Sequence, residues 1–264
     1  MATKPRISVV TVCYNASEVI EKTLRSVSSQ TYDNIEYLII DGASKDDTLD
    51  VVDLYSNHVD YLSSEPDKGL YDAMNKGIFA ATGDFLIFMN ADDVFADTDV
   101  VADVAAFIEE HPDVDAVFGD SQQILDHGTY TVRTKEPFKD HKITFSHQAV
   151  FIRVPVLRTH PFDLRFPYAA DYEQLSHFYL EGRKFAHIDR VIARVEMRGG
   201  TTFENNIASA EELYGIIASR GVDIEAEKRK MIRHKKMVRA FKRVIPKPIS
   251  DWVMRLIAKY YKPL

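Results

Sequence analysis

Short apolar runs alternate along this chain with segments in which apolar residues recur at helical spacing. The first run, Ile7–Cys13, is rich in β-branched residues and predicts a strand. The segment after it places Ile20, Leu24 and Val27 on one side of a helix that starts near Ser17. Repeated alternation of this kind predicts a parallel sheet that helices cover on both faces.

The alternation continues to about residue 93 and then loosens. Further strands are expected at residues 35–40, 59–63 and 85–89, and helices at about 44–55 and 71–81. Beyond these we expect helices at 100–110 and 172–182, strands at 116–118, 130–135 and 185–197, and a loop with binding surface over 136–170. A flexible link at 199–202 precedes a mainly helical segment that starts at about residue 208.

Length and cysteine content restrict the class of protein. The 264 residues suit one sizeable domain with an appendage. The single cysteine, Cys13, excludes an internal disulfide and is typical of a reducing compartment. No run approaches the roughly 18 apolar residues of a membrane-spanning helix, and the polar start lacks a signal-peptide pattern. We therefore expect a cytoplasmic protein, peripheral on the cytosolic face of the inner membrane.

The net charge of -7 conceals a basic C-terminal tail. Residues 225–264 carry 13 Lys and Arg against three Asp and Glu, so the preceding residues are strongly acidic, which argues against nucleic acid as a partner. In the tail, Trp252, Tyr260 and Tyr261 lie among apolar residues at helical spacing, which favours an interfacial helix on an anionic membrane surface. The alternative is a helix that packs on the acidic body.

The apolar run at residues 85–89 stops at Asn90-Ala91-Asp92-Asp93. Open α/β sheets bind their ligands beyond the carboxyl ends of such strands. Two adjacent carboxylates there predict a site for a divalent cation that bridges to a substrate phosphate, although they do not distinguish Mg²⁺ from Mn²⁺. The alternative, a helix N-cap, would use one carboxylate but hardly both.

Other loops offer groups for a nucleotide. Thr11, Tyr14 and Asn15 lie where the first strand ends, and such a loop can line a base and ribose. Lys68 precedes a helix, where its charge and the helix N-terminus can offset a diphosphate, and Asn75 on that helix can hold a loop through its backbone. The alternatives are a turn in which Asn tolerates a left-handed backbone, and a solvated loop charge.

Taken in order, these pieces resemble a known family. The set comprises Ser8–Asn15, Ser26–Tyr32, Glu36–Ser44, Glu65–Gly77, Ala81–Asp84 and Asn90–Asp93. It is similar to the family 2 glycosyltransferases, and within them to the bacterial surface-polysaccharide branch, over about residues 5–200. The resemblance implies an α/β protein of the GT-A fold, with a Rossmann-like, mostly parallel central sheet flanked by helices. It implies a domain over 1–205, with a nucleotide-sugar half at about 1–95 and an acceptor half at about 96–205, and a helical C-terminal extension over 206–264.

The resemblance also implies roles on the donor side. The loop residues named above are implied to lie beside the nucleotide. Asp41 is implied to read the base or ribose, although Gly42 stands where the family commonly has a second acid. Asn90 replaces the usual first Asp of the metal motif and is implied to contact ribose or to bind metal weakly. Asp92 and Asp93 then share the metal and ribose roles.

On the acceptor side, Asp171 matches the second acid of the family's Glu-Asp motif, with Ala170 in place of the Glu. Asp171 is therefore the implied catalytic base, and a helix cap is the alternative role. His147-Gln148 resembles a short motif beside the acceptor, although a lone histidine is more often structural.

The implied chemistry is inverting transfer from a nucleotide-diphosphate sugar, with a UDP-sugar favoured, to a hydroxyl of a glycan or polyprenyl-linked acceptor. A divalent cation, Mn²⁺ or Mg²⁺, is the implied cofactor. A non-catalytic nucleotide-sugar or glycan-binding protein on the same fold is the alternative. A nucleotidyltransferase is disfavoured because its Gly-rich loop is missing at Cys13-Tyr14-Asn15-Ala16, and a processive synthase because it needs spanning helices.

Overall fold

The computed structural model describes residues 4–125, 128–197 and 206–244. The chain divides into two compact units: Met1–Gln122 with Thr131–Val195, and Gln123–Tyr130 with Glu196–Leu264. The predicted domain boundary at residue 205 and the predicted link at 199–202 lie outside the described residues.

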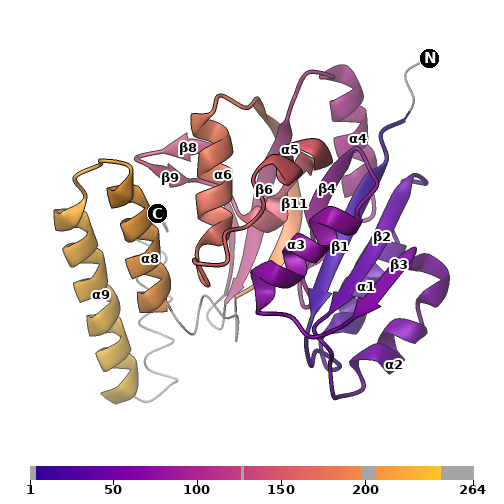
Figure 1. Ribbon diagram of the computed structural model, residues 1–264, viewed down its shortest axis with the longest axis horizontal. Coiled ribbons are helices and arrows are strands. Elements are labelled where there is room, and N and C mark those ends of the chain that lie inside the picture. Colours follow the sequence, from indigo (N-terminus) through magenta and orange to yellow (C-terminus); the bar gives the residue numbers. More distant parts are fainter. Residues whose placement is uncertain (1–3, 126–127, 198–205, 245–264) are drawn as a thin grey trace. The chain divides into compact units, whose positions relative to one another are not determined.

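The first unit opens with βα alternation, as the sequence predicts (Figure 1). Four parallel strands stand in the order β3-β2-β1-β4. The strands are β1 (Ile7–Cys13), β2 (Ile35–Asp41), β3 (Tyr61–Ser64) and β4 (Phe85–Phe88). The helices between them are α1 (Ile20–Ser28), α2 (Thr48–Asp53) and α3 (Leu70–Ala80), with a 3-10 turn at Ser56–His58. In register, Cys13 lies opposite Asp41, so β1 and β2 end together.

Burial explains why these residues form a covered sheet. Every residue of β1 is buried. Because strand side chains alternate between faces, Val10 and Val12 join the core under Met74 of α3, whereas Val9 is buried on the opposite face. The side of α1 that is buried includes Leu24, as its spacing predicted. Both faces of the parallel half are therefore covered at β1, whereas the edge strand β3 is largely exposed.

The rest of the large sheet includes antiparallel pairs, of β10 with β4 and β6 and of β11 with β5. The large sheet has the order β3-β2-β1-β4-β10-β6-β11-β5, with β7 on β6, and β8 and β9 form a separate pair. The added strands are β5 (Val94–Phe95), β6 (Ala116–Leu125), β7 (Gly128–Val132), β8 (Phe138–Lys139), β9 (Lys142–Ile143), β10 (Val150–Arg153) and β11 (Phe185–Glu196). The helices are α4 (Val100–Glu110), the 3-10 turn η2 (His147–Ala149), α5 (Val154–Thr159) and α6 (Ala170–Leu180).

The predicted loop over residues 136–170 is wrong, because β10 lies within it at the centre of the sheet. Ile152 of β10 lies opposite Leu86 of β4 and Ala116 of β6, and both pairings are antiparallel. The apolar run Val150-Phe151-Ile152 is too short for its periodicity to identify a strand. Its strand character comes from the two neighbours that it pairs with, which the local sequence does not contain.

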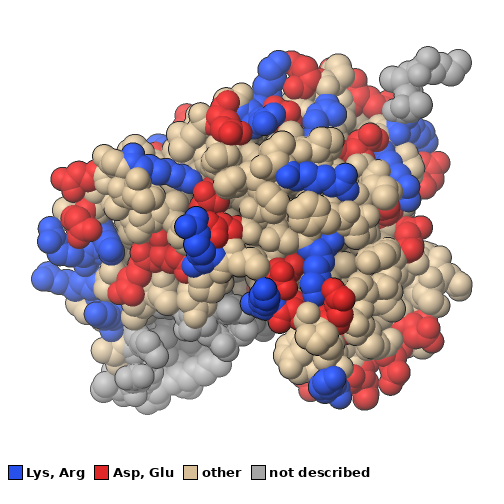
Figure 2. Space-filling model, in the orientation of Figure 1, with Lys and Arg blue, Asp and Glu red and all other residues tan. Residues whose placement is uncertain are grey.

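In the second unit, α8 (Asn206–Ser219) and α9 (Glu225–Val244) pack on each other. Tyr214 and Ile217 of α8 are buried. Figure 2 shows Lys and Arg side chains gathered over α9, in keeping with the basic composition of this segment. Within the described residues, no helix is long and apolar enough to cross a membrane. The tail aromatics predicted to bind membrane, Trp252, Tyr260 and Tyr261, lie outside that part of the chain.

Candidate active site

The carboxyl ends of β1, β2 and β4 are joined by backbone hydrogen bonds. The amide of Gly42 donates to the carbonyl of Cys13 at 2.9 Å, and the amide of Ala91 donates to that of Val12 at 3.3 Å. The loops that follow the three strands therefore start side by side, where a parallel α/β sheet binds its ligands.

The loop after β1 is fastened to the loop after β2. Asn15 has a left-handed backbone, with φ of 47°, which asparagine tolerates better than most residues. Its amide donates to Oγ of Ser44 at 2.8 Å, and its Oδ1 accepts from the amide of Lys45 at 2.8 Å. Tyr14 beside it is 62% exposed, so the loop presents an aromatic ring to solvent.

Thr11 lies deeper than the predicted nucleotide loop. Its side chain is fully buried, and its hydroxyl donates to the carbonyl of Met89 at 2.7 Å and contacts the hydroxyl of Tyr37 at 3.0 Å. The hydroxyl of Thr11 therefore links β1 to the start of the loop after β4, and the exposed members of the loop after β1 are Tyr14 and Asn15.

Asp41 is a fully buried carboxylate at the end of β2. It accepts from the amide of Ser44 at 3.0 Å and from the hydroxyls of Ser44 and Ser64 at 2.5 Å and 2.6 Å. Burial alone would raise the pKa of Asp41, but these hydrogen bonds outweigh it and hold the pKa below its usual value. Asp41 is thus an ionised group whose oxygens organise the loop.

A second carboxylate fills the space beside Gly42. A Cβ built on Gly42 would lie 2.5 Å from Oδ2 of Asp67 and 3.3 Å from Cδ2 of Tyr14. Asp67 is held there through its other oxygen, which accepts from the amide of Gly69 at 2.8 Å. A carboxylate from the loop before α3 therefore occupies the space that a side chain at position 42 would take.

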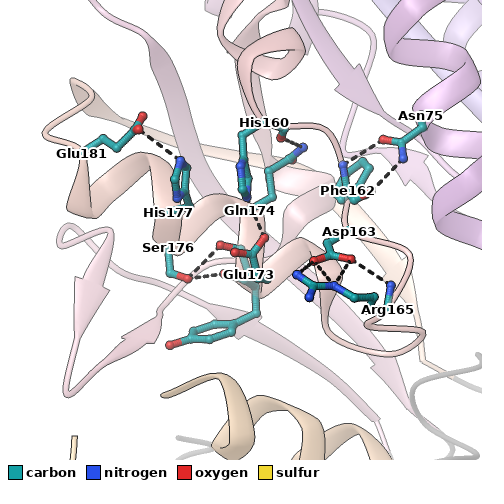
Figure 3. A network of polar contacts seen from close by, with 11 residues as sticks. Asn75, His160, Phe162, Asp163, Arg165, Glu173, Gln174, Ser176, His177 and Glu181 are labelled. Carbon is teal, nitrogen blue, oxygen red and sulfur yellow. Dashed lines mark hydrogen bonds and ion pairs between the residues drawn. The ribbon is translucent and has the colours of Figure 1, made fainter. Parts of the chain in front are cut away.

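That loop leads into α3. Lys68 is exposed, and its amide donates to the carboxylate of Asp72 at 3.0 Å. Asn75 is predicted to hold a loop by bonding to backbone, and both ends of its carboxamide bond the backbone of Phe162, at 2.9 Å and 2.8 Å (Figure 3). Asn75 therefore ties α3 to the segment that precedes α6.

The segment after β4 has an unusual backbone conformation that contacts with α1 hold in place. Asp92 has φ of 91°, which is uncommon for a residue other than glycine. Its amide donates to Oγ1 of Thr23 at 3.0 Å, and this hydroxyl donates to the carbonyl of Asp93 at 2.8 Å. The ammonium of Lys22 contacts the carboxylate of Asp92. Two residues of α1 therefore fix the turn and bring a positive charge to it.

The donor atoms of this segment fit a hard cation. Asp93 is 4% exposed and accepts from Nε2 of Gln148 at 3.1 Å. Nδ2 of Asn90 contacts Nε2 of His147 at 3.4 Å. Oδ1 of Asn90 is buried and has no hydrogen-bond partner among the described residues. An unpaired buried polar atom costs about 1–3 kcal/mol, so a ligand for it is favoured. Carboxylate and amide oxygens are the ligands that Mg²⁺ and Mn²⁺ prefer.

Asp171 is the second residue of α6 and the centre of a polar group. Tyr71 of α3 donates its hydroxyl to Oδ1 at 2.9 Å, and Nδ1 of His147 lies 3.0 Å from Oδ2. Burial alone would raise the pKa of Asp171, but the contacts with His147 and Tyr71 lower it. Burial alone would lower the pKa of His147, but Asp171 raises it. The two side chains therefore form an ion pair whenever the imidazole of His147 is protonated.

The turn η2 joins this acid to the segment after β4. His147 contacts both Asp171 and Asn90, at 3.0 Å and 3.4 Å, and the adjacent Gln148 bonds Asp93. Four segments that are distant in sequence thus meet in one network, with an ionised acid on one side and the Asn90–Asp93 carboxylates on the other.

Sequence analysis did not single out three residues of the site, Lys22, Asp67 and Tyr71. Asp67 and Tyr71 belong to a quoted motif, so the signal was present without a role attached to it. Lys22 carries no local signal, because its partner Asp92 is reached only through the packing of α1 against the loop after β4.

The fold has a parallel βα half whose strand ends carry carboxylates, and α6 and the turn η2 connect a further acid, Asp171, to them. These features define a glycosyltransferase of the GT-A fold. The chain belongs to glycosyl transferase family 2, whose family model matches residues 8–162. This identifies the protein as an enzyme and confirms the fold class inferred from its motifs.

Individual proteins agree with this membership. The chain is 34% identical to the PGL/p-HBAD biosynthesis glycosyltransferase of Mycobacterium bovis over 177 residues. The aligned region covers 64% of this chain and 68% of that protein. The fold of this chain is similar to that of S. aureus TarS 1–349 in complex with UDP-GlcNAc, with a TM-score of 0.65 and 20% identity. The match covers 86% of this chain and 70% of the TarS chain. The fold is also similar to that of the mannosyltransferase PcManGT from Pyrobaculum calidifontis in complex with GDP-Man and Mn²⁺ (TM-score 0.66, 18% identity, 99% and 82%).

Proposed function

We propose that this enzyme transfers a sugar, with inversion, from a nucleotide-diphosphate sugar to a hydroxyl of a glycan or lipid-linked glycan in surface-polysaccharide biosynthesis. The observation that carries the proposal is the network in which His147 and Gln148 join Asp171 to Asn90–Asp93. This network supports a general base close to oxygen ligands for a cation that would bind the donor diphosphate, and displacement at an anomeric carbon requires such an arrangement.

The donor site is proposed at the ends of β1 and β2. Tyr14 offers an exposed ring beside the base, and the partly exposed Asp67 offers a carboxylate that can accept from N–H groups of a base or from ribose hydroxyls. The buried carboxylate of Asp41 would act on the nucleotide by holding the loop that bears these groups. TarS was solved with UDP-GlcNAc and PcManGT with GDP-Man, which supports a nucleotide sugar as donor. A UDP-sugar is the first candidate.

The proposed cation site comprises Asp92 and Asp93, with Asn90 beside them. PcManGT was solved in complex with GDP-Man and Mn²⁺, and a divalent cation at the site proposed here would offset the charge of the leaving diphosphate. The need for a cation follows from charge, because the strand ends bear several carboxylates and the donor diphosphate is anionic. Lys68 at the start of α3 is proposed to add a positive charge on the same side.

Asp171 is proposed to accept the proton of the acceptor hydroxyl as that oxygen attacks C1 of the sugar. Its lowered pKa keeps it ionised at neutral pH, which a base requires before reaction. Tyr71 and His147 each bond one oxygen of Asp171 and so fix the orientation of the carboxylate. His147 also contacts Asn90, so the base is positioned relative to the donor site by direct contact.

The class of acceptor is proposed from a relative and from charge. The Mycobacterium bovis relative is named for PGL/p-HBAD biosynthesis, which supports a surface glycoconjugate as product. The basic residues of α9 support an acceptor at an anionic membrane, such as a polyprenyl-linked glycan. Full-length protein is expected to sediment with anionic but not with neutral vesicles, and to be released by high salt.

The central test compares Asp171→Asn with Asp53→Asn, a matched change at an exposed site on α2. Donor binding is measured as the thermal shift given by each nucleotide sugar with Mn²⁺, and transfer or donor hydrolysis by release of the nucleoside diphosphate. We expect Asp171→Asn to keep donor binding within about twofold and to lose turnover by 100-fold or more. Asp53→Asn should retain both.

Two outcomes would contradict the proposal. Equal loss of donor binding and turnover in Asp171→Asn would show that this residue supports the fold or the donor rather than the proton transfer. No thermal shift with any nucleotide sugar in the unaltered protein would remove the donor site and favour a binding protein for another ligand.

A further inference from the structure

We propose that His160, Glu173 and His177 form a binding site for a transition-metal ion, with Zn²⁺ as the best fit. The three side chains come from α6 and from the residue that follows α5. None of them belongs to the donor and base network described above. Among the described residues, these are the three whose nitrogen and carboxylate donor atoms lie within 4.8 Å of one another.

The fold places the three donors on one side of α6 (Figure 3). Glu173 and His177 are four residues apart on this helix, so they lie one turn apart on the same face. Nε2 of His160 lies 2.9 Å from Oε2 of Glu173, and the ring of His160 stacks on that of His177 with centroids 3.7 Å apart. Gln174 of α6 donates to the carbonyl of His160 at 2.8 Å and so holds its backbone in place.

The chemistry of the donors selects the ion. Two imidazoles and one carboxylate are a common set for Zn²⁺, which completes its tetrahedral shell with a water. Mg²⁺ and Ca²⁺ prefer oxygen ligands, so this set differs in kind from the oxygen ligands of Asp92 and Asp93. Zn–N and Zn–O bonds are about 2.0–2.2 Å long, so the donor atoms, already within 4.8 Å of one another, meet at one ion when the stacked rings of His160 and His177 rotate apart.

The surroundings also suit an ion. Side-chain exposure is 29% for His160, 14% for Glu173 and 34% for His177, so the donors are partly covered and still reachable from solvent. Metal-bound histidines commonly donate their second ring N–H to a carboxylate. Glu181 provides such a group, because its Oε1 lies 3.1 Å from Nε2 of His177.

An ion at this site would act on the position of α6 rather than on the reaction itself. His160 lies two residues before Phe162, whose backbone Asn75 of α3 already holds. A bound ion would add a second fastening, between this segment and the helix that starts with Ala170 and Asp171. We therefore expect the ion to raise thermal stability, since a ligand that binds only the folded state stabilises it.

The test uses full-length protein that has been stripped with EDTA and dialysed, and the probe is Zn²⁺ itself. Binding is measured by competition with a chromophoric chelator in the unaltered protein, in His160→Gln, in His177→Gln and in His58→Gln, an exposed histidine outside the site. The double variant Asp92→Asn/Asp93→Asn removes the other carboxylate site. We expect one Zn²⁺ per chain, at least tenfold weaker binding in the first two variants, and unchanged binding in the control and the double variant.

A second readout needs no substitution. Diethylpyrocarbonate modifies accessible imidazoles, and mass spectrometry locates the modified residue. Zn²⁺ should protect His160 and His177 but leave His58 reactive. The proposal is overturned if the unaltered protein binds no Zn²⁺ in micromolar competition, if His160→Gln and His177→Gln bind as it does, or if Zn²⁺ protects neither histidine. Loss of Zn²⁺ binding in the double variant alone would assign the ion to the strand ends instead.

Discussion

The ion pair of His147 and Asp171 gives a prediction that can be worked through in detail. The perturbation is a double-mutant cycle of His147→Gln, Asp171→Asn and the combination, which measures the coupling between the two side chains. The contact is 3.0 Å long, and the side chains are 19% and 26% exposed, so solvent screens it only in part. A hydrogen bond between charged groups contributes about 1.5–3 kcal/mol, and we expect a coupling of about 2 kcal/mol at pH 6.

The pH dependence follows from the direction of each pKa shift. His147 has a raised pKa, so its contribution is complete below its unfolded value of about 6.5 and is lost as pH rises through the folded value. Asp171 has a lowered pKa, so its contribution is complete above about pH 3.9 and is lost as pH falls through the folded value. The coupling is therefore greatest between about pH 4 and 6.5.

The assay is urea unfolding of the four proteins at pH 6 and pH 9, with EDTA present so that bound ions do not contribute. At pH 9 the imidazole is neutral and only its hydrogen bond to the carboxylate of Asp171 remains, so the coupling should fall to about 1 kcal/mol. Titrations elsewhere in the chain are common to all four proteins and cancel in the cycle. A coupling that is the same at both pH values, or that is near zero at pH 6, would refute the ion pair.

Three further predictions concern other parts of the molecule. Glu36 is a buried carboxylate that accepts from Ser8, Thr82 and Gly83. Glu36→Ala should lower the free energy of unfolding in urea by about 3 kcal/mol and Glu36→Gln by clearly less, since Ala leaves buried donors unpaired. The hydrogen bonds outweigh burial and lower the pKa of Glu36, so the stability that its carboxylate contributes is lost as pH falls below about 4.3. Gly42→Ala should displace the neighbouring carboxylate and weaken donor binding about tenfold by calorimetry, and an unchanged affinity would contradict that placement. Asp93→Ala should abolish the Mn²⁺-dependent part of the donor's thermal shift, and a retained shift would remove this residue from the cation site.

The parallel half of the fold was predictable because its signals are local. β1 and α4 have the bounds that the apolar patterns give, and the other early elements differ by a few residues. The centre of the sheet was not predictable in the same way. β10 is four residues long and buried between two antiparallel partners, so tertiary pairing rather than its own pattern makes it a strand.

The candidate site likewise contains residues that the sequence identifies and contacts that it does not predict. Asn90–Asp93 and Asp171 stand out in the sequence by position and motif, and the structure brings them into one network through His147. The contact of Lys22 with Asp92 and that of Tyr71 with Asp171 join residues that are far apart in the chain. Such pairings depend on how α1 and α3 pack on the sheet, which spacing alone does not give.

The placement of Asp67 beside Gly42 has a consequence for the redesign of donor preference. Substitutions at positions 42 and 67 are coupled, since a side chain at position 42 and the carboxylate of Asp67 would occupy the same space. Grafting the acidic pair of other family members onto Asp41-Gly42 would therefore make residue 42 collide with Asp67 unless residue 67 is made smaller at the same time. A combinatorial library for a new nucleotide should vary positions 42 and 67 together, because either one alone samples mostly combinations that do not fit.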